Sequence, residues 1–383
     1  MTNNEIQAQL EQFSQDESVH IRSRAQIILQ TLEGKTPAEI TSALNVSLPT
    51  VKKWQLAWTE QGMGIFPPIQ VPGATPVEAK AALTFSEAEP IQHNDSLAEA
   101  ARKTLRAQLQ QMIDMEPIAR AGEDREGVHK MRVATRRLRS AYRIFDTYLP
   151  EGYFKKIPKR LRGTAQALGS VRDLDVALIK IEKYIERDLK GDQAALEPLL
   201  ALISARHQTA RDTLLQWLDS NDYQAFINRL YKVTSSPAPE HPARVDHHLP
   251  LMIYERLEMV RGYEDQLADA DYATLHSLRI EFKRLRYLLE FFSGVLGKPI
   301  AQVIQEIKNV QDHLGDLNDA VVAVDLIDSL IPHLPEAQRS GARQYQTARQ
   351  TEIEKLITTF PQVWKQFNRQ ELREALALAI AGL

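Results

Sequence analysis

Two segments of the chain repeat one pattern of histidine, arginine and lysine: residues 128–145, VHKMRVATRRLRSAYRIF, and residues 275–292, LHSLRIEFKRLRYLLEFF. Such closely spaced cations could bind a phosphate-rich anion, because arginine makes paired hydrogen bonds to phosphate oxygens and keeps its proton. Histidine beside an anion can gain a charge and add a pH-dependent contribution. The cations are His129, Arg132, Arg136, Arg139 and Arg143 in the first segment, and His276, Arg279, Lys283 and Arg286 in the second.

Both segments must be helical for these cations to act together. At about 100° per residue, the cations of each segment fall on one face, and apolar residues such as Met131 and Leu138 cover the other. A solvated face is the alternative explanation, but solvated faces usually mix both signs, because like charges four residues apart repel by about a few tenths of a kcal/mol. The recurrence of identical offsets also argues against an unconstrained surface. We therefore predict a specific anion site, although Glu290 replaces the fifth cation of the second segment.

The charge of the chain is unevenly distributed. Its 383 residues have a formal net charge of −3, yet residues 130–172 contain twelve Lys and Arg against Asp146 and Glu151, which favours a polyanionic partner. The lack of cysteine excludes disulfides and thiolate metal sites, and no apolar run approaches the roughly 18 residues of a membrane span. The polar start MTNNEIQAQLEQ does not have the layout of a signal peptide, so we expect a cytoplasmic protein.

The first section, residues 1–65, is predicted to be a small helical domain. Thr36 and Glu39 form a capping box around the start of a helix, and further helices are expected at residues 19–32 and after residue 47. These helices resemble the helix-turn-helix of homeodomain-like and transposase-type DNA-binding domains. The resemblance rests on the pattern AEIxxxLxVSxxTVxxW at residues 38–54.

By that resemblance, the last of these helices would enter the major groove of DNA. The charge of the section gives little support, because residues 1–62 carry five Lys and Arg against seven Asp and Glu, and phosphate neutralisation supplies most non-specific affinity for DNA. DNA binding and a protein-contact role therefore both stay open. The residues that would face DNA are Ser47, Leu48, Thr50, Lys52 and Lys53.

Residues 66–95 are predicted to be a linker, since prolines punctuate them and no apolar periodicity persists. Residues 96–383 are predicted to be helical, with a break at 234–250 that separates two halves, about 96–233 and 250–383. Each half contains a lead helix, a basic helix, a segment with glycine and a long helix, in that order. We therefore expect an all-α fold with an internal duplication, built as two pseudo-symmetric four-helix bundles.

The segments with glycine, LGSVRD and LGDLND, end in Asp173 and Asp319. A carboxylate at this point could anchor a guanidinium of the basic helix. We expect these aspartates to orient Arg137 or Arg284 rather than to act in catalysis.

The paired H-x-x-R-x-x-x-[RK]-R-L-R helices, together with L-G-x-x-R-D and L-G-x-L-N-D, are similar to the CHAD family, an α-helical domain named for its histidines; the resemblance covers roughly residues 96–383. It implies two pseudo-symmetric bundles around a basic cavity, binding of inorganic polyphosphate and association with polyphosphate granules. The cations of both basic helices would then contact phosphate. Further candidates by the same resemblance are Arg172, Arg211, Lys308 and Arg349. The second half has Asn318 at the position that corresponds to Arg172.

The main hypothesis is a non-enzymatic polyphosphate-binding protein that needs no cofactor or metal and has DNA as a candidate second partner. A phosphohydrolase acting on polyphosphate is the competing hypothesis, with histidine as phosphoryl acceptor or Asp312, Asp316 and Asp319 as metal ligands. The chain contains no Gly-rich phosphate loop, no H-E-x-x-H and no E-x-E-x-K, the motif of the triphosphate tunnel enzymes that accompany some CHAD domains. A transcription regulator with a polyanion sensor is the third hypothesis.

Overall fold

The computed structural model describes residues 6–7, 10–11, 13–14, 19–44, 46, 48–62, 83, 85, 89–154, 156–190 and 194–383. These residues are helical and contain no strand, only an isolated bridge between Ser96 and Arg244. None of their helices is long and apolar enough to cross a membrane. The chain divides into two compact units, Met1–Ala82 and Leu83–Leu383. Ser47 and most of the predicted linker at 66–95 lie outside the described residues.

The first unit contains the helices expected from the sequence: α2 (Val19–Leu32), α3 (Pro37–Leu44) and α4 (Leu48–Gln61). The capping box at the start of α3 is confirmed. The backbone N–H and the hydroxyl of Thr36 both donate to Glu39 Oε2 at 2.8 Å, and the Glu39 N–H donates to the Thr36 hydroxyl at 3.4 Å. The described core of this unit consists of Leu10, Phe13, Ala25, Ile27, Ile28, Ile40 and Val51.

The helices of the second unit are α5 (Leu97–Ala121), α6 (Arg125–Phe145), α7 (Ile157–Asp188), α8 (Glu197–Asp219), α9 (Asn221–Ser235), α10 (Val245–Arg261), α11 (Tyr272–Phe291), α12 (Ser293–Leu296), α13 (Ile300–Leu330), α14 (Arg339–Phe367) and α15 (Gln370–Ala381), with 3-10 helices at Asp146–Tyr148, Glu264–Asp269, Ile331–His333 and Glu336–Gln338. Local capping fixes several starts, because Ser96, Asp124 and Asp271 each accept a hydrogen bond from a backbone N–H in the first turn of α5, α6 and α11. Helices α7 and α13 have 32 and 31 residues, so each extends over more than 45 Å at about 1.5 Å per residue.

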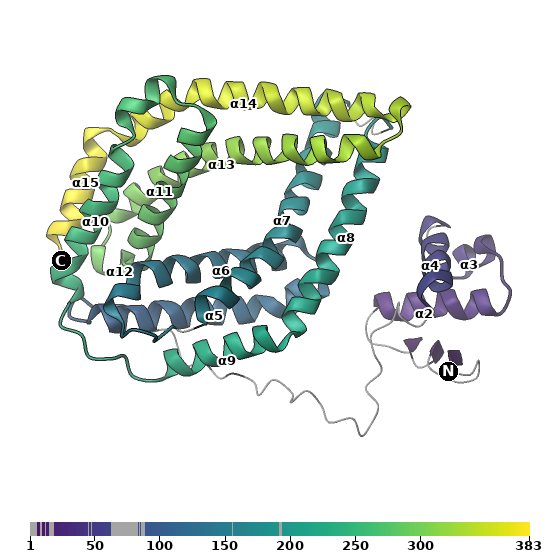
Figure 1. Ribbon diagram of the computed structural model, residues 1–383, viewed down its shortest axis with the longest axis horizontal. Coiled ribbons are helices and arrows are strands. Elements are labelled where there is room, and N and C mark those ends of the chain that lie inside the picture. The colour runs from purple at the N-terminus through teal and green to yellow at the C-terminus, as the bar shows by residue number, and fades with distance from the viewer. Residues whose placement is uncertain are drawn as a thin grey trace. The chain divides into compact units, whose positions relative to one another are not determined.

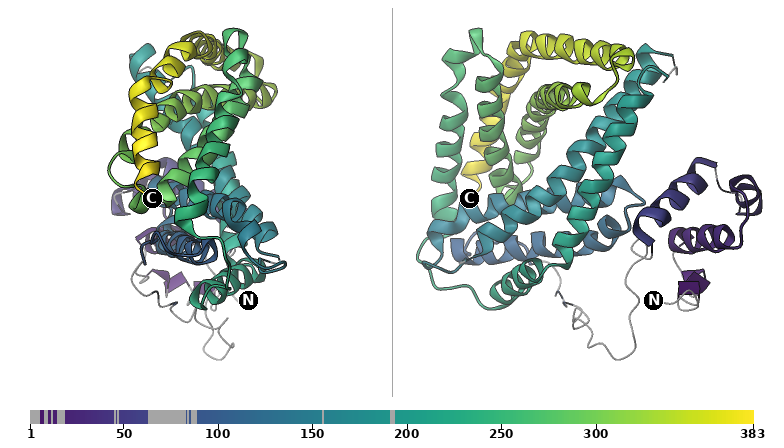
Figure 2. Two further views of the ribbon diagram at one scale, coloured as in Figure 1. Left: turned by 90° about the vertical axis from the view of Figure 1, so that its left-hand side faces the viewer. Right: turned by 45° about the vertical axis from the view of Figure 1, so that its right-hand side comes forward.

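These helices form a four-sided frame (Figure 1). One side consists of α5, α6 and α9, the next is the α7–α8 hairpin, the third is the α13–α14 hairpin, and the fourth consists of α10, α11 and α15. The same sides can be followed in the turned views (Figure 2). The first and fourth sides join where Leu97 N donates to Ala243 O at 2.8 Å and Val245 N donates to Asp95 O at 2.9 Å. The two lead helices, α5 and α10, therefore begin side by side.

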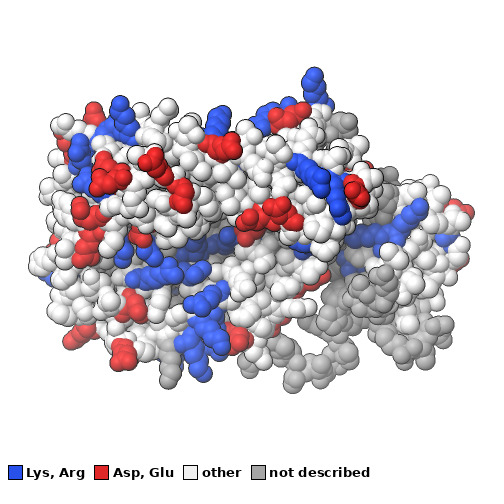
Figure 3. Space-filling model, turned by 45° about the horizontal axis from the view of Figure 1, so that its top comes forward, with Lys and Arg blue, Asp and Glu red and all other residues white. Residues whose placement is uncertain are grey.

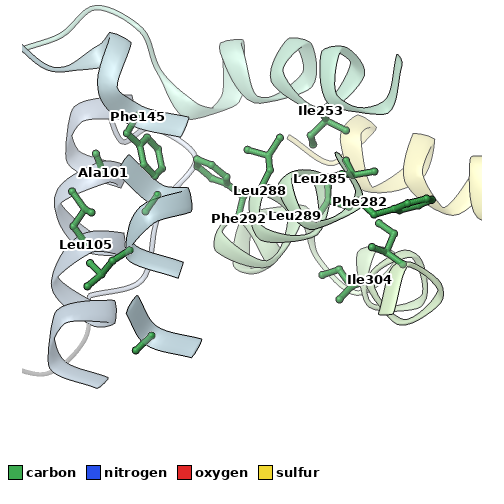
Figure 4. Packing of buried hydrophobic residues seen from close by; sticks show 14 of the residues in the cluster. Ala101, Leu105, Phe145, Ile253, Phe282, Leu285, Leu288, Leu289, Phe292 and Ile304 are labelled. Atoms are coloured by element: carbon green, nitrogen blue, oxygen red, sulfur yellow. The ribbon is translucent and has the colours of Figure 1, made fainter. Parts of the chain in front are cut away.

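Two hydrophobic cores hold the frame together, and each draws residues from both predicted halves. In the larger core, Phe145 of α6 and Phe292 at the end of α11 point toward one another, with ring centroids 5.9 Å apart (Figure 4). The smaller core joins the far ends of the two hairpins, where the rings of Tyr184 and Tyr345 meet edge-on at 5.0 Å. The all-α class is confirmed. The internal duplication into two pseudo-symmetric bundles stays a prediction.

Candidate polyanion-binding site

The basic faces of α6 and α11 meet at one cavity of about 270 Å³, whose other walls come from α7 and α13. On one face of the molecule, Lys and Arg side chains gather in a hollow (Figure 3). The cavity is lined by Arg132, Arg136, Asp173, Val176, Ala177, Lys180, Arg279, Lys283, Asn318, Asp319, Val322, Ala323 and Leu326.

Four cations predicted from the two basic helices therefore share this cavity, Arg132 among them. The other three, Arg136, Arg279 and Lys283, make no hydrogen bond or ion pair within the part of the chain that the structure describes. The Nε atoms of both arginines are buried without an acceptor. A buried donor without an acceptor costs about 1–3 kcal/mol. An anion in the cavity would supply the missing acceptors.

The lining is positively charged and has no aromatic side chain. Five Lys and Arg residues face two carboxylates, those of Asp173 and Asp319. One of the five, Lys180 of α7, is neutralised by Asp316 of α13 at 2.8 Å. The remaining wall is apolar and consists mainly of aliphatic side chains. An apolar wall lowers the local dielectric, so it strengthens the interaction of the cations with a bound anion.

Asp173 orients Arg132 of α6. Arg132 Nη1 donates to Asp173 Oδ1 at 2.7 Å and to the carbonyl of Gly169 at 3.1 Å. The prediction that Asp173 orients Arg137 is therefore wrong. Arg137 instead forms an ion pair with Glu290 of α11, because it points toward the crossing of the two basic helices and not toward α7.

Burial shifts the titration of the groups in the cavity. It lowers the pKa of Lys283 from 10.5 to about 7, with further lowering by the positive charges of Arg279 and Arg136. Burial also lowers the pKa of Arg279 and raises that of Asp319, although the attraction between these two opposes both shifts. Asp319 therefore faces Arg279, not Arg284 as the sequence suggested. Near neutral pH Lys283 is therefore only partly protonated in the unliganded site, and a bound anion would favour its charged form.

The two histidines lie beside the cavity, outside its lining. His276 Nδ1 is 3.1 Å from Oδ1 of Asn318, which does line the cavity, and 3.4 Å from the hydroxyl of Tyr272. Burial, followed by the positive charge of Arg172, lowers the pKa of His129. The two halves therefore differ. The positive charge of Arg172 lowers the pKa of His129, whereas its counterpart Asn318 forms a hydrogen bond with His276.

Arg286 lies near Lys283 at the crossing of α6 and α11. Its guanidinium is 5.2 Å from the ring centroid of Tyr287, which Arg136 and Arg137 also approach, at 5.7 and 5.6 Å. Cation–π attraction of this kind partly offsets the repulsion among the three arginines. Glu290 forms ion pairs with both Arg137 and Arg286. The row of cations on α11, Arg279, Lys283 and Arg286, therefore ends at Glu290.

The C-terminal half of α6 leads away from the cavity. Arg139 lies near Arg143 and Arg162, and burial, aided by these two positive charges, lowers its pKa. Arg143 lines a separate cavity of about 230 Å³ together with Arg256 and Arg284. The structure therefore does not bring Arg139 and Arg143 together with the other predicted cations.

Three further candidates also lie outside the lining. Arg211 donates to two carbonyls at the end of α5, at 3.0 and 3.4 Å, as expected for a cation that caps a helix C-terminus. Arg349 is buried beside the smaller core, where it contacts Glu352 at 2.5 Å. Lys308 precedes Asn318 by ten residues on α13, which places it about 15 Å away along the helix.

The sequence reasoning missed Lys180 and the aliphatic wall. Lys180 follows Asp173 by seven residues, about two helical turns, so both project from one face of α7. That spacing is the feature of the sequence from which Lys180 could have been predicted. Asp316, considered above as a metal ligand, contacts Lys180 instead. The described residues contain no group of three or more His, Asp or Glu that could hold a metal ion.

In the first unit, α4 presents part of the predicted DNA-facing surface. Lys52 and Lys53 are exposed, Leu48 is 40% exposed and Thr50 is partly buried. The ammonium of Lys53 lies 5.0 Å from the ring centroid of Trp54. Two lysines and a leucine of the predicted surface are therefore exposed to solvent on this helix.

Comparisons with known proteins identify both units. Residues 103–328 match the CHAD domain, and residues 21–64 match a homeodomain-like domain. The CHAD domain from the plant Ricinus communis is 26% identical, with a TM-score of 0.57, over 78% of this chain and 96% of that one. PptA from Streptomyces chartreusis shares the fold with a TM-score of 0.58 and 18% identity, over 71% of this chain and all of that one. No curated protein matches. Because the CHAD match spans more than half of the sequence and includes both basic helices, the chain belongs to the CHAD family.

Proposed function

We propose that this protein is a non-enzymatic binding protein for inorganic polyphosphate. The observation that carries the proposal is the cavity between α6 and α11, in which Arg136, Arg279 and Lys283 have no acceptor. Partly buried like charges without a counterion are unfavourable, so this arrangement suits an anionic ligand. Polyphosphate offers oxygen acceptors along a flexible chain, and the guanidinium group pairs with such oxygens. Membership of the CHAD family supports the same ligand.

The lining favours polyphosphate over nucleic acid. Single-stranded nucleic acid is usually bound partly by stacking of bases on aromatic rings. No aromatic residue lines the cavity. A ligand that consists only of phosphates needs no such surface, so we expect polyphosphate to bind more tightly than DNA or RNA at the same phosphate concentration.

Loss of cations from either helix should weaken binding by similar amounts. The change Arg132→Ala with Arg136→Ala removes the contribution of α6, and Arg279→Ala with Lys283→Ala removes that of α11. Each pair should cost about 2–4 kcal/mol, because charge-assisted hydrogen bonds contribute roughly 1.5–3 kcal/mol apiece and do not add fully. Isothermal titration calorimetry with long-chain polyphosphate measures both losses.

The matched control is Arg229→Ala with Lys232→Ala, which removes the same formal charge from exposed positions on α9. We expect near-normal affinity. A shared site is refuted if one helix proves dispensable, or if the control costs as much as either pair. Incubation of polyphosphate with the protein and magnesium tests for an enzyme, since chain shortening or orthophosphate release would show catalysis.

DNA binding by the first unit is a second proposal, favoured by the homeodomain-like match and by the exposed Lys52 and Lys53. A fragment of residues 1–64 should bind weakly or not at all as a monomer, because its sequence contains five Lys and Arg against seven Asp and Glu. Dimerisation would be needed for tight binding. Tight, sequence-specific binding by a monomeric fragment in a mobility-shift assay would contradict the charge argument.

A further inference from the structure

The cavity lined by Arg143 is a second concentration of positive charge. Arg143 of α6, Arg256 of α10 and Arg284 of α11 surround about 230 Å³, and no carboxylate belongs to the lining. Arg143 and Arg256 make no hydrogen bond or ion pair to any described residue, while Arg284 contacts Glu281 at 2.5 Å. Solvated surfaces normally intersperse both signs. Three arginines that converge from three helices are therefore better explained by an anionic ligand.

Helix α6 connects this cavity to the first one. Arg136 lines the first cavity and Arg143 the second. They are seven residues apart, which is about 10 Å along the helix axis. Arg139 lies between them, within reach of the charges of Arg143 and Arg162. A cation is thus available at each helical turn from one cavity to the other.

We propose that the cavity formed by Arg143, Arg256 and Arg284 is a second subsite for the same polyphosphate chain, which follows α6 from the first cavity. This inference rests on the proposed function and extends it. Arg256 belongs to no repeated motif, and Arg284, the counterpart of Arg137 in the repeated motif, was not among the predicted phosphate contacts. Only the packing of α10 and α11 against α6 therefore assigns these two arginines this role.

Two linked subsites make affinity depend on chain length. A short chain such as tripolyphosphate fills the first cavity alone. A chain that spans both cavities binds the second one intramolecularly, at a high effective concentration, which commonly raises affinity by about 100-fold or more. Affinity per chain should therefore rise steeply once the ligand is long enough to span α6, and then level off.

The test uses the full-length protein with two probes, tripolyphosphate and size-fractionated long-chain polyphosphate, compared per chain. The variant Arg256→Gln with Arg284→Gln leaves the lining of the first cavity untouched. We expect its Kd for tripolyphosphate to stay within about twofold, and its Kd for the long chain to rise by about tenfold or more. Arg256→Gln alone, which breaks no described hydrogen bond or ion pair, should give an intermediate loss in a normally folded protein. Arg229→Gln with Lys232→Gln is the matched control.

The outcomes separate this inference from the proposed function. If the wild-type protein binds both probes and the double variant binds the long chain equally well, the second subsite does not exist. Equal weakening toward both probes would also overturn it, because the loss would then come from the first cavity or from general charge. If the wild-type protein binds neither probe, the proposed function fails and the second subsite fails with it.

Discussion

Lys283 should couple polyphosphate binding to the uptake of a proton. In the unliganded protein, burial and the surrounding arginines of α6 and α11 lower its pKa from 10.5 to about 7. Phosphate oxygens in the cavity would favour the charged ammonium and return the pKa toward its ordinary value. At pH 8, a group with a pKa of about 7 is about one-tenth protonated, so binding should take up about 0.9 proton and affinity should fall about tenfold per pH unit above neutrality.

Calorimetric titration at pH 8, in two buffers of different ionisation enthalpy, measures this uptake. Long chains are the suitable ligand, because only the two terminal phosphates carry a weakly acidic proton, so proton exchange by the ligand itself is small per bound phosphate. The variant Lys283→Met should abolish the uptake, and its deficit in affinity relative to the wild type should shrink between pH 7 and 9. Uptake that persists in the variant would assign the proton to another group and refute this role of Lys283. A wild-type protein that takes up no proton would refute it as well.

The same lysine should lower the stability of the unliganded fold. Its pKa is lower in the folded protein than in the unfolded chain, so folding releases a proton between about pH 7 and 10.5, and stability decreases as the pH falls through that window. Lys283→Met removes this penalty. It should raise the free energy of unfolding at pH 7 by about 2 kcal/mol, after the full shift is discounted for the solvated part of the side chain. Urea unfolding at pH 7 checks this, and a less stable variant would contradict it.

Polyphosphate affinity should fall steeply with salt, because several cations each release condensed counterions; a titration series that stays flat between about 50 and 200 mM salt would count against a site of many cations. Arg137→Ala should lower the free energy of unfolding by about 2–3 kcal/mol, since it removes the main partner of the largely buried Glu290, and an unchanged urea midpoint would show that the pair is dispensable. Gly341→Ala should destabilise the domain by about 1–3 kcal/mol, because the added Cβ would lie 2.1 Å from the carbonyl oxygen of Ala195, a backbone atom that cannot swing aside. Gly315→Ala is its control, since that Cβ would meet nothing within 4 Å, and equal stability of both variants would refute the clash.

The helices and the positions of the cations on them could be predicted from the sequence, because these features depend on neighbours within four residues. The capping box at Thr36 and the limits of α2 were predicted correctly from side-chain hydrogen bonding and apolar spacing. The pattern of residues 128–145 likewise placed Arg132 and Arg136 on one helical face, and the same offsets placed Arg279 on its counterpart. Local rules were sufficient for these statements.

Which cations share a cavity was decided only by the tertiary structure. Arg136 and Arg143 lie on one stripe of α6, and the sequence treats them alike. Arg136 nevertheless shares a cavity with residues of α7, α11 and α13, whereas Arg143 shares one with Arg256 of α10 and Arg284 of α11. Lys180 enters the site from α7 although it belongs to no repeated motif. The reason is physical: helical periodicity determines the face on which a side chain lies, but the element that covers each turn of that face depends on packing between residues more than a hundred positions apart in the chain.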